Sequence, residues 1–247
     1  MITSAEARKD PSMTRSITRS YERRIAKLFK NYLSKAAALM KMRTYESVRR
    51  PTMMINFTHL ADSLLWLIES QITMPGRDIM SSMIDGAMRA GQVRASAFLR
   101  AVGVQATLGS IMVDPQVREV LNDRALTLLT GVTEDMGKNI KVQLSEGILK
   151  GEGMKKLAKR LEETTGMAEQ RARLVARTET MYAFNTAARE EYRRYGVEKV
   201  EWVAAMDERT CPRCGPLHGR VFPMDQAPDC PLHPNCRCIT IPYIEEA

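Results

Sequence analysis

Cysteine and histidine residues near the end of the sequence occur in two short segments of the same form. In residues 211–214 and 233–236, a potential metal ligand, a proline and one further residue precede a cysteine. Thiolate sulfur and imidazole nitrogen are typical zinc ligands, and a two-residue gap lets one turn aim both side chains at one ion. The pattern C-x2-C-x18-H-x2-C therefore predicts a zinc site formed by Cys211, Cys214, His233 and Cys236.

Cys238 is an alternative to Cys236 as the fourth ligand of this site. Cys238 lies two residues after Cys236 and offers a second thiol, while Cys230 and His218 stand outside the repeated form. The opposing interpretation is a group of buried thiols or a disulfide. An odd count of five cysteines argues against it. The first ten residues also lack the apolar region of a secretory signal, so we expect a cytoplasm-like compartment, in which disulfides are rare.

The predicted zinc ion is structural rather than catalytic. A catalytic zinc keeps one position open and has a general acid or base nearby. His59 is the only histidine upstream of the cysteines, and Leu60 and Ala61 follow it, so the H-x-E element of deaminases is absent. The sequence also lacks an H-E-x-x-H motif, a P-loop and a G-x-S-x-G motif. We therefore expect no enzymatic activity.

Most of the chain that precedes the cysteines has helical periodicity. Apolar residues recur every three or four positions, and Asp114-Pro115 and Gly196 are typical of a helix start and a helix end. Pro75-Gly76 and residues 164–166 are expected to interrupt helices. The expected helices span 14–49, 57–73, 77–103, 116–130, 133–148, 154–161 and 167–195.

After Gly196 the periodicity changes to alternation. Residues 200–204 and 238–243 are expected to be strands, with Pro242 placing the second strand at a sheet edge or ending it. The predicted fold is mainly α, with a helical N-terminal region followed by a small α+β, zinc-stabilised C-terminal domain. The predicted domains are residues 1–149 and 150–247. The second comprises the long helix 167–195 and a zinc-binding, β-rich part at 196–247.

Positive charge is concentrated at the N-terminus. The first 50 residues contain 13 Lys and Arg and 4 Asp and Glu, against 37 and 29 in the whole chain. This basic arm either binds nucleic acid or an acidic protein surface, or forms an ordinary solvated helix. No apolar run approaches the roughly 20 residues of a membrane span, so we expect no membrane contact.

Several short elements follow one another in a characteristic order and spacing between residues 150 and 243. These are Arg171-Ala172-Arg173, Ala176-Arg177-Thr178-Glu179, Asn185, Ala187, Gly196-Val197, Trp202, residues 207–214, Leu217-His218-Gly219 and residues 233–238. By this series, residues 150–243 resemble the phage Mu F-like minor head protein family, also called the phage head morphogenesis family. His218 departs from the acidic or amide residue common before that glycine, and Cys230 is an addition.

The resemblance implies a structural minor head protein of a tailed bacteriophage. Such proteins are low-copy head components that take part in procapsid assembly, and some are linked to DNA delivery. The implied partners are the portal protein, the major capsid protein or both, with scaffold and packaged DNA as further candidates through residues 8–50. The implied location is the head interior or the vicinity of the portal, after assembly in the host cytoplasm, as a homo-oligomer or in portal symmetry. The resemblance also marks Arg173, Arg177, Thr178, Glu179, Trp202 and Asp207 as interaction or domain-packing residues.

The alternative function is a zinc-containing DNA-binding or nuclease-type DNA-processing protein. His218, His233 and Asn235 near a zinc turn, together with the basic N-terminal arm, are the features that favour it. This alternative predicts metal-dependent DNA cleavage, or DNA binding that weakens steeply with salt.

Overall fold

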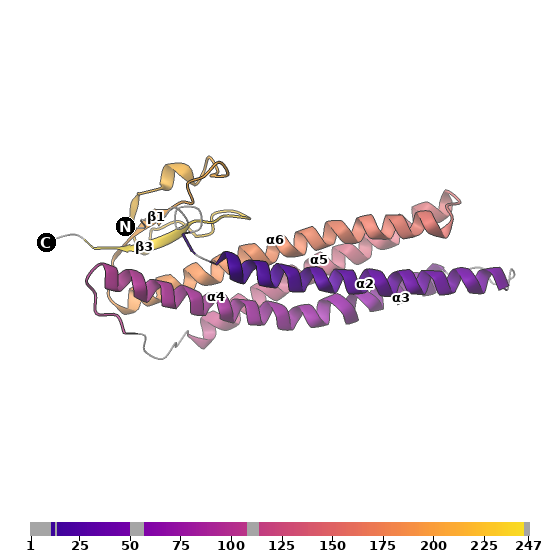
Figure 1. The fold of residues 1–247 in the computed structure, drawn as a ribbon, viewed down its shortest axis with the longest axis horizontal. Coiled ribbons are helices and arrows are strands. Elements are labelled where there is room, and N and C mark those ends of the chain that lie inside the picture. Colours follow the sequence, from indigo (N-terminus) through magenta and orange to yellow (C-terminus); the bar gives the residue numbers. More distant parts are fainter. Residues whose placement is uncertain (1–10, 13, 50–56, 108–113, 245–247) are drawn as a thin grey trace. The chain divides into compact units, whose positions relative to one another are not determined.

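The computed structural model describes residues 11–12, 14–49, 57–107 and 114–244, and most of them are helical (Figure 1). A mainly helical chain with a small C-terminal sheet is confirmed. No helix in these ranges combines the length and apolarity needed to cross a bilayer. The helices are α2 (Arg15–Arg49), α3 (Phe57–Ile68), the π-helix η1 (Glu69–Thr73), α4 (Met74–Ala101), α5 (Pro115–Leu149), α6 (Met154–Arg194) and the 3-10 turn η2 (Gly215–Leu217).

Two predicted helix ends are confirmed. The Asp114 carboxylate accepts a hydrogen bond from the Gln116 amide at 2.8 Å, so it caps the start of α5, and Pro115 occupies the first helical position. At the end of α6, Gly196 adopts a φ of +70°, and the Val197 amide donates to the Tyr192 carbonyl. That bond across five residues closes the helix in the manner typical of glycine C-caps.

The predicted interruption at Pro75-Gly76 is wrong. Just before the proline the helix widens into η1, where the Met74 amide donates to the Glu69 carbonyl, and α4 continues through Pro75. Gly76 serves helix packing instead, because a Cβ there would lie 2.6 Å from a methyl group of Leu129 on α5. Proline and glycine thus sit inside a helical segment whose local geometry and neighbours accommodate them.

Two further predicted interruptions are also wrong. The helix expected at 167–195 begins at Met154, since the backbone stays helical through residues 164–166. The hydroxyls of Thr164 and Thr165 donate to the carbonyls four residues earlier, which satisfies them within the helix. The helices expected at 116–130 and 133–148 are the single helix α5. There the Thr133 hydroxyl bonds to the Thr130 carbonyl.

The sheet has three antiparallel strands in the order β2-β1-β3. They are β1 (Lys199–Val203), β2 (Val221–Pro223) and β3 (Ile239–Tyr243). The predictions for β1 and β3 are confirmed, and Pro242 lies on an edge strand as expected. Strand β2 was not predicted, because it has only three residues and none of them is fully buried.

The chain forms two compact units, each assembled from segments that are distant in sequence. One comprises residues 22–80 and 124–175, and the other residues 1–21, 81–123 and 176–247. The first is a helical unit whose buried side chains include Ile25, Tyr32 and Leu64. The second, called the C-terminal unit below, contains the sheet and every cysteine. The predicted division of the chain at residue 150 stays a prediction.

Candidate metal centre

The first cysteine turn follows a tight loop that leaves strand β1. Asp207 and Thr210 close this loop, since the Thr210 hydroxyl accepts from the Asp207 amide at 2.9 Å and also lies 2.6 Å from the Ala205 carbonyl. The Cys214 amide then donates to both the carbonyl and the sulfur of Cys211. An amide directed at a sulfur favours the thiolate form, which is the form that binds metals.

The second cysteine turn, at residues 233–236, repeats the backbone hydrogen bond of the first turn. Here the Cys236 amide donates to the His233 carbonyl. Asn235 has a φ of +64°, a left-handed conformation that asparagine adopts more readily than most residues. The His233 ring lies 2.7 Å from the Pro234 carbonyl through Nδ1. Since a carbonyl only accepts, Nδ1 carries the proton and Nε2 keeps its lone pair for a ligand.

The two turns bring their ligand atoms together. Nε2 of His233 lies 3.0 Å from Sγ of Cys211 and 3.2 Å from Sγ of Cys214. Sγ of Cys214 also lies 3.8 Å from Sγ of Cys236. Two overlapping groups could hold a metal ion, one of Cys211, Cys214 and His233 and one of Cys214, Cys236 and Cys238. All four predicted ligands therefore lie in one cluster, with Cys214 common to both groups.

The cluster also sets which thiols ionise easily. Hydrogen bonding with the Cys230 and Cys238 thiols lowers the pKa of Cys236 far below its usual value. Burial raises the pKa of Cys214 to about 12, and hydrogen bonding to Cys236, with burial, raises the pKa of Cys238. Neighbouring thiolates repel one another in a buried site, so ionising them together requires a cation between them. A divalent metal ion would supply that charge.

Three side chains near the cluster bear on the choice of ligands. Cys238 lies in the second group, so the structure keeps both Cys236 and Cys238 within reach of a fourth position. The Cys230 thiol donates to the Cys238 carbonyl at 3.0 Å. His218 accepts from the Ala204 amide through Nδ1. Neither Cys230 nor His218 belongs to a metal-holding group among the residues that the structure describes.

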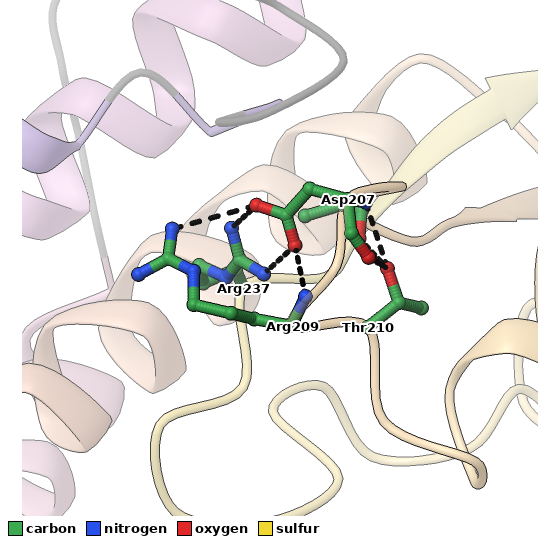
Figure 2. Close-up of polar contacts among 5 residues, drawn as sticks. Asp207, Arg209, Thr210 and Arg237 are labelled. Carbon is green, nitrogen blue, oxygen red and sulfur yellow. Dashed lines mark hydrogen bonds and ion pairs between the residues drawn. The ribbon is translucent and has the colours of Figure 1, made fainter.

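An ion pair joins the two ligand-bearing segments (Figure 2). The guanidinium of Arg237, between Cys236 and Cys238, donates to both carboxylate oxygens of Asp207 at 2.6 Å. Arg209 adds its amide at 3.0 Å and its guanidinium at 3.4 Å. The Asp207 side chain is only 4% exposed, and bonding to Arg237 lowers the pKa of its carboxyl group well below the usual range. The loop before the first turn is thus tied to the segment after the second.

Helix α6 supports the cluster from one side. The Asn185 amide donates to the Cys238 carbonyl at 3.3 Å and its oxygen accepts from the Thr240 amide at 3.4 Å. Arg189 donates to the Pro228 carbonyl at 2.6 Å, and the Tyr192 hydroxyl donates to the Thr240 carbonyl at 3.2 Å. Asn185, Arg189 and Tyr192 follow one another at spacings of four and three residues, so they share one face of α6. Together they fix the start of β3 next to the cysteines.

The residues that the family resemblance marked as interaction or packing residues lie in different surroundings. Arg177 donates to the Asn235 side chain at 3.3 Å, so it contacts the second turn. Trp202 is fully buried in a cluster with Cys214, Cys230, Cys236 and Cys238.

The other marked residues of α6 differ in exposure. Glu179 is 1% exposed, whereas Thr178 is half-buried. Arg173 is exposed and pairs with Glu169 one helical turn away.

Arg237 and Arg189 position the cluster, although neither was predicted to do so. The signal for Arg237 was present, because an arginine between two cysteines and an aspartate before the first turn form a complementary pair. No signal marked Arg189, whose partners are the carbonyl of residue 228 and the Thr240 hydroxyl. Contacts with backbone carbonyls carry no side-chain pattern that a sequence could display.

Residues 138–241 match the family described as Phage Mu protein F like protein. This range contains the last third of α5, all of α6 and every residue of the cysteine cluster. The resemblance inferred from the sequence is confirmed over this range.

Two relatives share part of the chain. An uncharacterised protein of Haemophilus influenzae is 28% identical over 142 residues, covering 53% of this chain and 31% of that protein. An uncharacterised protein of Methanocaldococcus jannaschii is 29% identical over 146 residues, covering 56% of this chain and 23% of its own length. The matches thus span a third or less of either relative. No solved structure matches significantly.

Proposed function

We propose that this chain is a structural, non-enzymatic minor head protein of a tailed bacteriophage whose C-terminal part folds around a zinc ion. The observation that carries the proposal is the position of the Cys-His cluster within the family match at residues 138–241. The portal protein, the major capsid protein or both would be its partners during procapsid assembly. Its location would be the interior of the phage head or the vicinity of the portal, and it would also take part in DNA delivery.

Zinc suits the donor set of the cluster. Three thiolates and one imidazole are a common ligand set for structural zinc, whereas magnesium and calcium prefer oxygen ligands. Cys211, Cys214, His233 and Cys236 would hold the ion, with Cys238 as the alternative to Cys236. The ion would supply folding free energy, because ligands from two turns converge only in the folded chain.

Metal content is the first test of the zinc proposal. Elemental analysis of the purified chain should give about one zinc per chain, and Cys214→Ser should lose it because Cys214 belongs to both ligand groups. Cys230→Ala is the matched control, since it removes a buried thiol outside those groups. Comparing Cys236→Ser with Cys238→Ser then identifies the fourth ligand. A folded wild-type chain that contains no metal would contradict the proposal.

Head incorporation tests the assembly role separately. The chain is to be co-expressed with the portal, scaffold and major capsid proteins encoded in the same genome, and purified procapsids analysed by quantitative mass spectrometry. We expect the wild-type chain at low copy and the Cys214→Ser variant to be depleted. Procapsids that assemble normally and exclude the wild-type chain would contradict the assembly role whatever the metal content.

A cleavage assay tests the non-enzymatic part of the proposal. We expect supercoiled DNA to stay intact with the purified chain and zinc, magnesium or manganese ions. Its support is the position of His218, which is engaged with the Ala204 amide and lies outside the metal-holding groups. Metal-dependent cleavage that disappears in His218→Ala would favour the DNA-processing alternative instead.

A further inference from the structure

A cavity in the C-terminal unit is lined by an unusual number of arginines. Its volume is about 280 Å³. Three separate segments contribute guanidinium groups: the first residues of α2, the middle of α6, and the loops that carry the cysteine turns. The lining residues are Thr14, Arg15, Thr18, Arg19, Arg177, Met181, Arg209, Cys236 and Arg237.

Positive charge exceeds negative charge around this cavity. No carboxylate is among the described residues that line it. Asp207 lies beside it, bonded to Arg209 and Arg237 (Figure 2), and Glu179 is buried two residues after Arg177. The five arginines that line the cavity therefore outnumber these two neighbouring carboxylates. Such an excess in a partly enclosed space attracts anions strongly, because water screens it less than at an open surface.

The start of α2 adds to this positive field. The Thr18 amide donates to the Thr14 carbonyl, which places Thr14 at the N-terminus of the helix, and the first turn contains no acidic residue. The aligned peptide dipoles of a helix give its N-terminus a partial positive charge. Thr14 and Thr18 also bring hydroxyl groups to the cavity wall, and hydroxyl groups can donate to an anion.

We propose that this cavity binds a phosphate group. Arginine matches phosphate because its planar fork donates two parallel hydrogen bonds to a pair of phosphate oxygens. A phosphate offers more acceptor oxygens than a carboxylate, so it can engage guanidinium groups from several segments at once. Arg177 is already oriented here by its bond to Asn235, and Arg209 and Arg237 by Asp207.

The phosphate has two sources with the same chemistry. It is either a free phosphate ion or a phosphodiester of a nucleic-acid strand. A single-stranded oligonucleotide separates them, because a strand spans the cavity and its surroundings and should bind more tightly and with a steeper dependence on salt. This inference does not rest on a role in head assembly, and it holds or fails independently of that role.

The experiment measures binding to the purified, full-length chain at low ionic strength. The probes are inorganic phosphate, by calorimetry, and a short single-stranded oligonucleotide, by fluorescence anisotropy. The test variant is Arg15→Ala with Arg19→Ala, since both side chains are exposed. The control is Arg89→Ala with Arg213→Ala, which removes two exposed arginines of the same unit that do not line the cavity. Arg177→Gln is a second, independent variant.

We expect the wild-type chain to bind phosphate and the test variant to bind it at least about tenfold more weakly, as the loss of charge-assisted hydrogen bonds implies. Arg177→Gln should weaken binding similarly, and the control should stay within about twofold of wild type, since its arginines lie outside the cavity.

Tighter binding of the oligonucleotide, displaced by phosphate, would identify a nucleic-acid strand as the source of the phosphate group. Equal loss in test and control variants, or no binding of either probe, would overturn the proposal. Binding of poly-glutamate but of neither probe would also overturn it, in favour of an acidic peptide.

Discussion

The long helices bury leucine, isoleucine and methionine side chains along most of their length, whereas the part after Gly196 has strands of only three to five residues. The helices therefore have apolar area enough to fold by burial. In the short-stranded part, four cysteines pack around Trp202, where a core of similar size would hold larger aliphatic groups. A small domain with such a core commonly needs a metal or a disulfide to be stable. One chain can therefore rely on the burial of apolar side chains in one region and on metal coordination in another.

The largest expected effect comes from removing the shared ligand. Cys214→Ser, or chelation of the metal in the wild-type chain, should unfold the part after Gly196 while the helices persist, because the helices do not depend on coordination. Near-ultraviolet circular dichroism should lose the Trp202 signal, and far-ultraviolet circular dichroism should keep most of its helical signal. A fully retained Trp202 signal in the metal-free chain would break the contrast between the two regions.

The helices should respond instead to a change in packing. A Cβ at Gly91 on α4 would lie 2.2 Å from the Phe184 carbonyl oxygen on α6, and backbone atoms cannot move away as a side chain can. Gly91→Ala should lower the free energy of unfolding by about 3 kcal/mol, measured by denaturant titration. Gly131→Ala is the matched control, because a Cβ there meets nothing within 4 Å. It should raise the free energy by about 0.5–1 kcal/mol, since alanine favours helices over glycine. Equal effects would contradict the packing account.

Breaking the ion pair that joins the ligand segments should have a smaller effect. Asp207→Asn should lower the free energy of unfolding by about 2 kcal/mol, as expected for a buried, charge-assisted pair. The control is Asp225→Asn, because the Asp225 side chain is 89% exposed. This control should change the free energy of unfolding by less than about 0.5 kcal/mol. Folding lowers the pKa of Asp207, so the ionised carboxylate stabilises the folded chain. This contribution to the free energy of unfolding is fully present above pH ~4 and is lost as the pH falls further. Denaturant titrations of wild type and Asp207→Asn across acidic pH should therefore converge, and a constant difference would contradict this account.

The smallest effect is expected for an exposed pair between helices. Arg118 on α5 donates to both oxygens of Asp85 on α4, at 2.6 and 3.1 Å, but the side chains are 52% and 36% exposed. Arg118→Ala should cost only about 0.5 kcal/mol of unfolding free energy, because water and salt screen an exposed pair. The cost should shrink further at high salt in the same titration. A loss as large as that of Asp207→Asn would erase the distinction between the two regions.

The sequence predicted features that depend on local chemistry. The cap at Asp114, the helix end at Gly196 and strands β1 and β3 each follow from residues within a few positions of one another. The cysteine cluster was predictable for the same reason, since each half is one short turn. The zinc ion itself and the roles of the ligands stay predictions.

The interruptions at Pro75 and at residues 164–166 were predicted wrongly because the compensating features are not local. A widened turn before Pro75 and the packing of Gly76 against Leu129 keep one helix continuous. In the metal centre, the bond between Arg237 and Asp207 spans 30 residues, and that between Asn185 and the Cys238 carbonyl spans 53. Contacts at such separations depend on the tertiary fold and leave no periodicity in the sequence.

The ion pair between Asp207 and Arg237 also bears on how easily the site assembles around its metal. The 18 residues between Cys214 and His233 form a loop whose ends must meet before four ligands can act together. Asp207 precedes the first ligand pair and Arg237 follows the second, so their bond joins the chain on either side of this loop. When that bond forms during folding, it raises the effective concentration of one ligand pair toward the other. The ion pair and the metal ion thus share the entropic cost of closing the same loop.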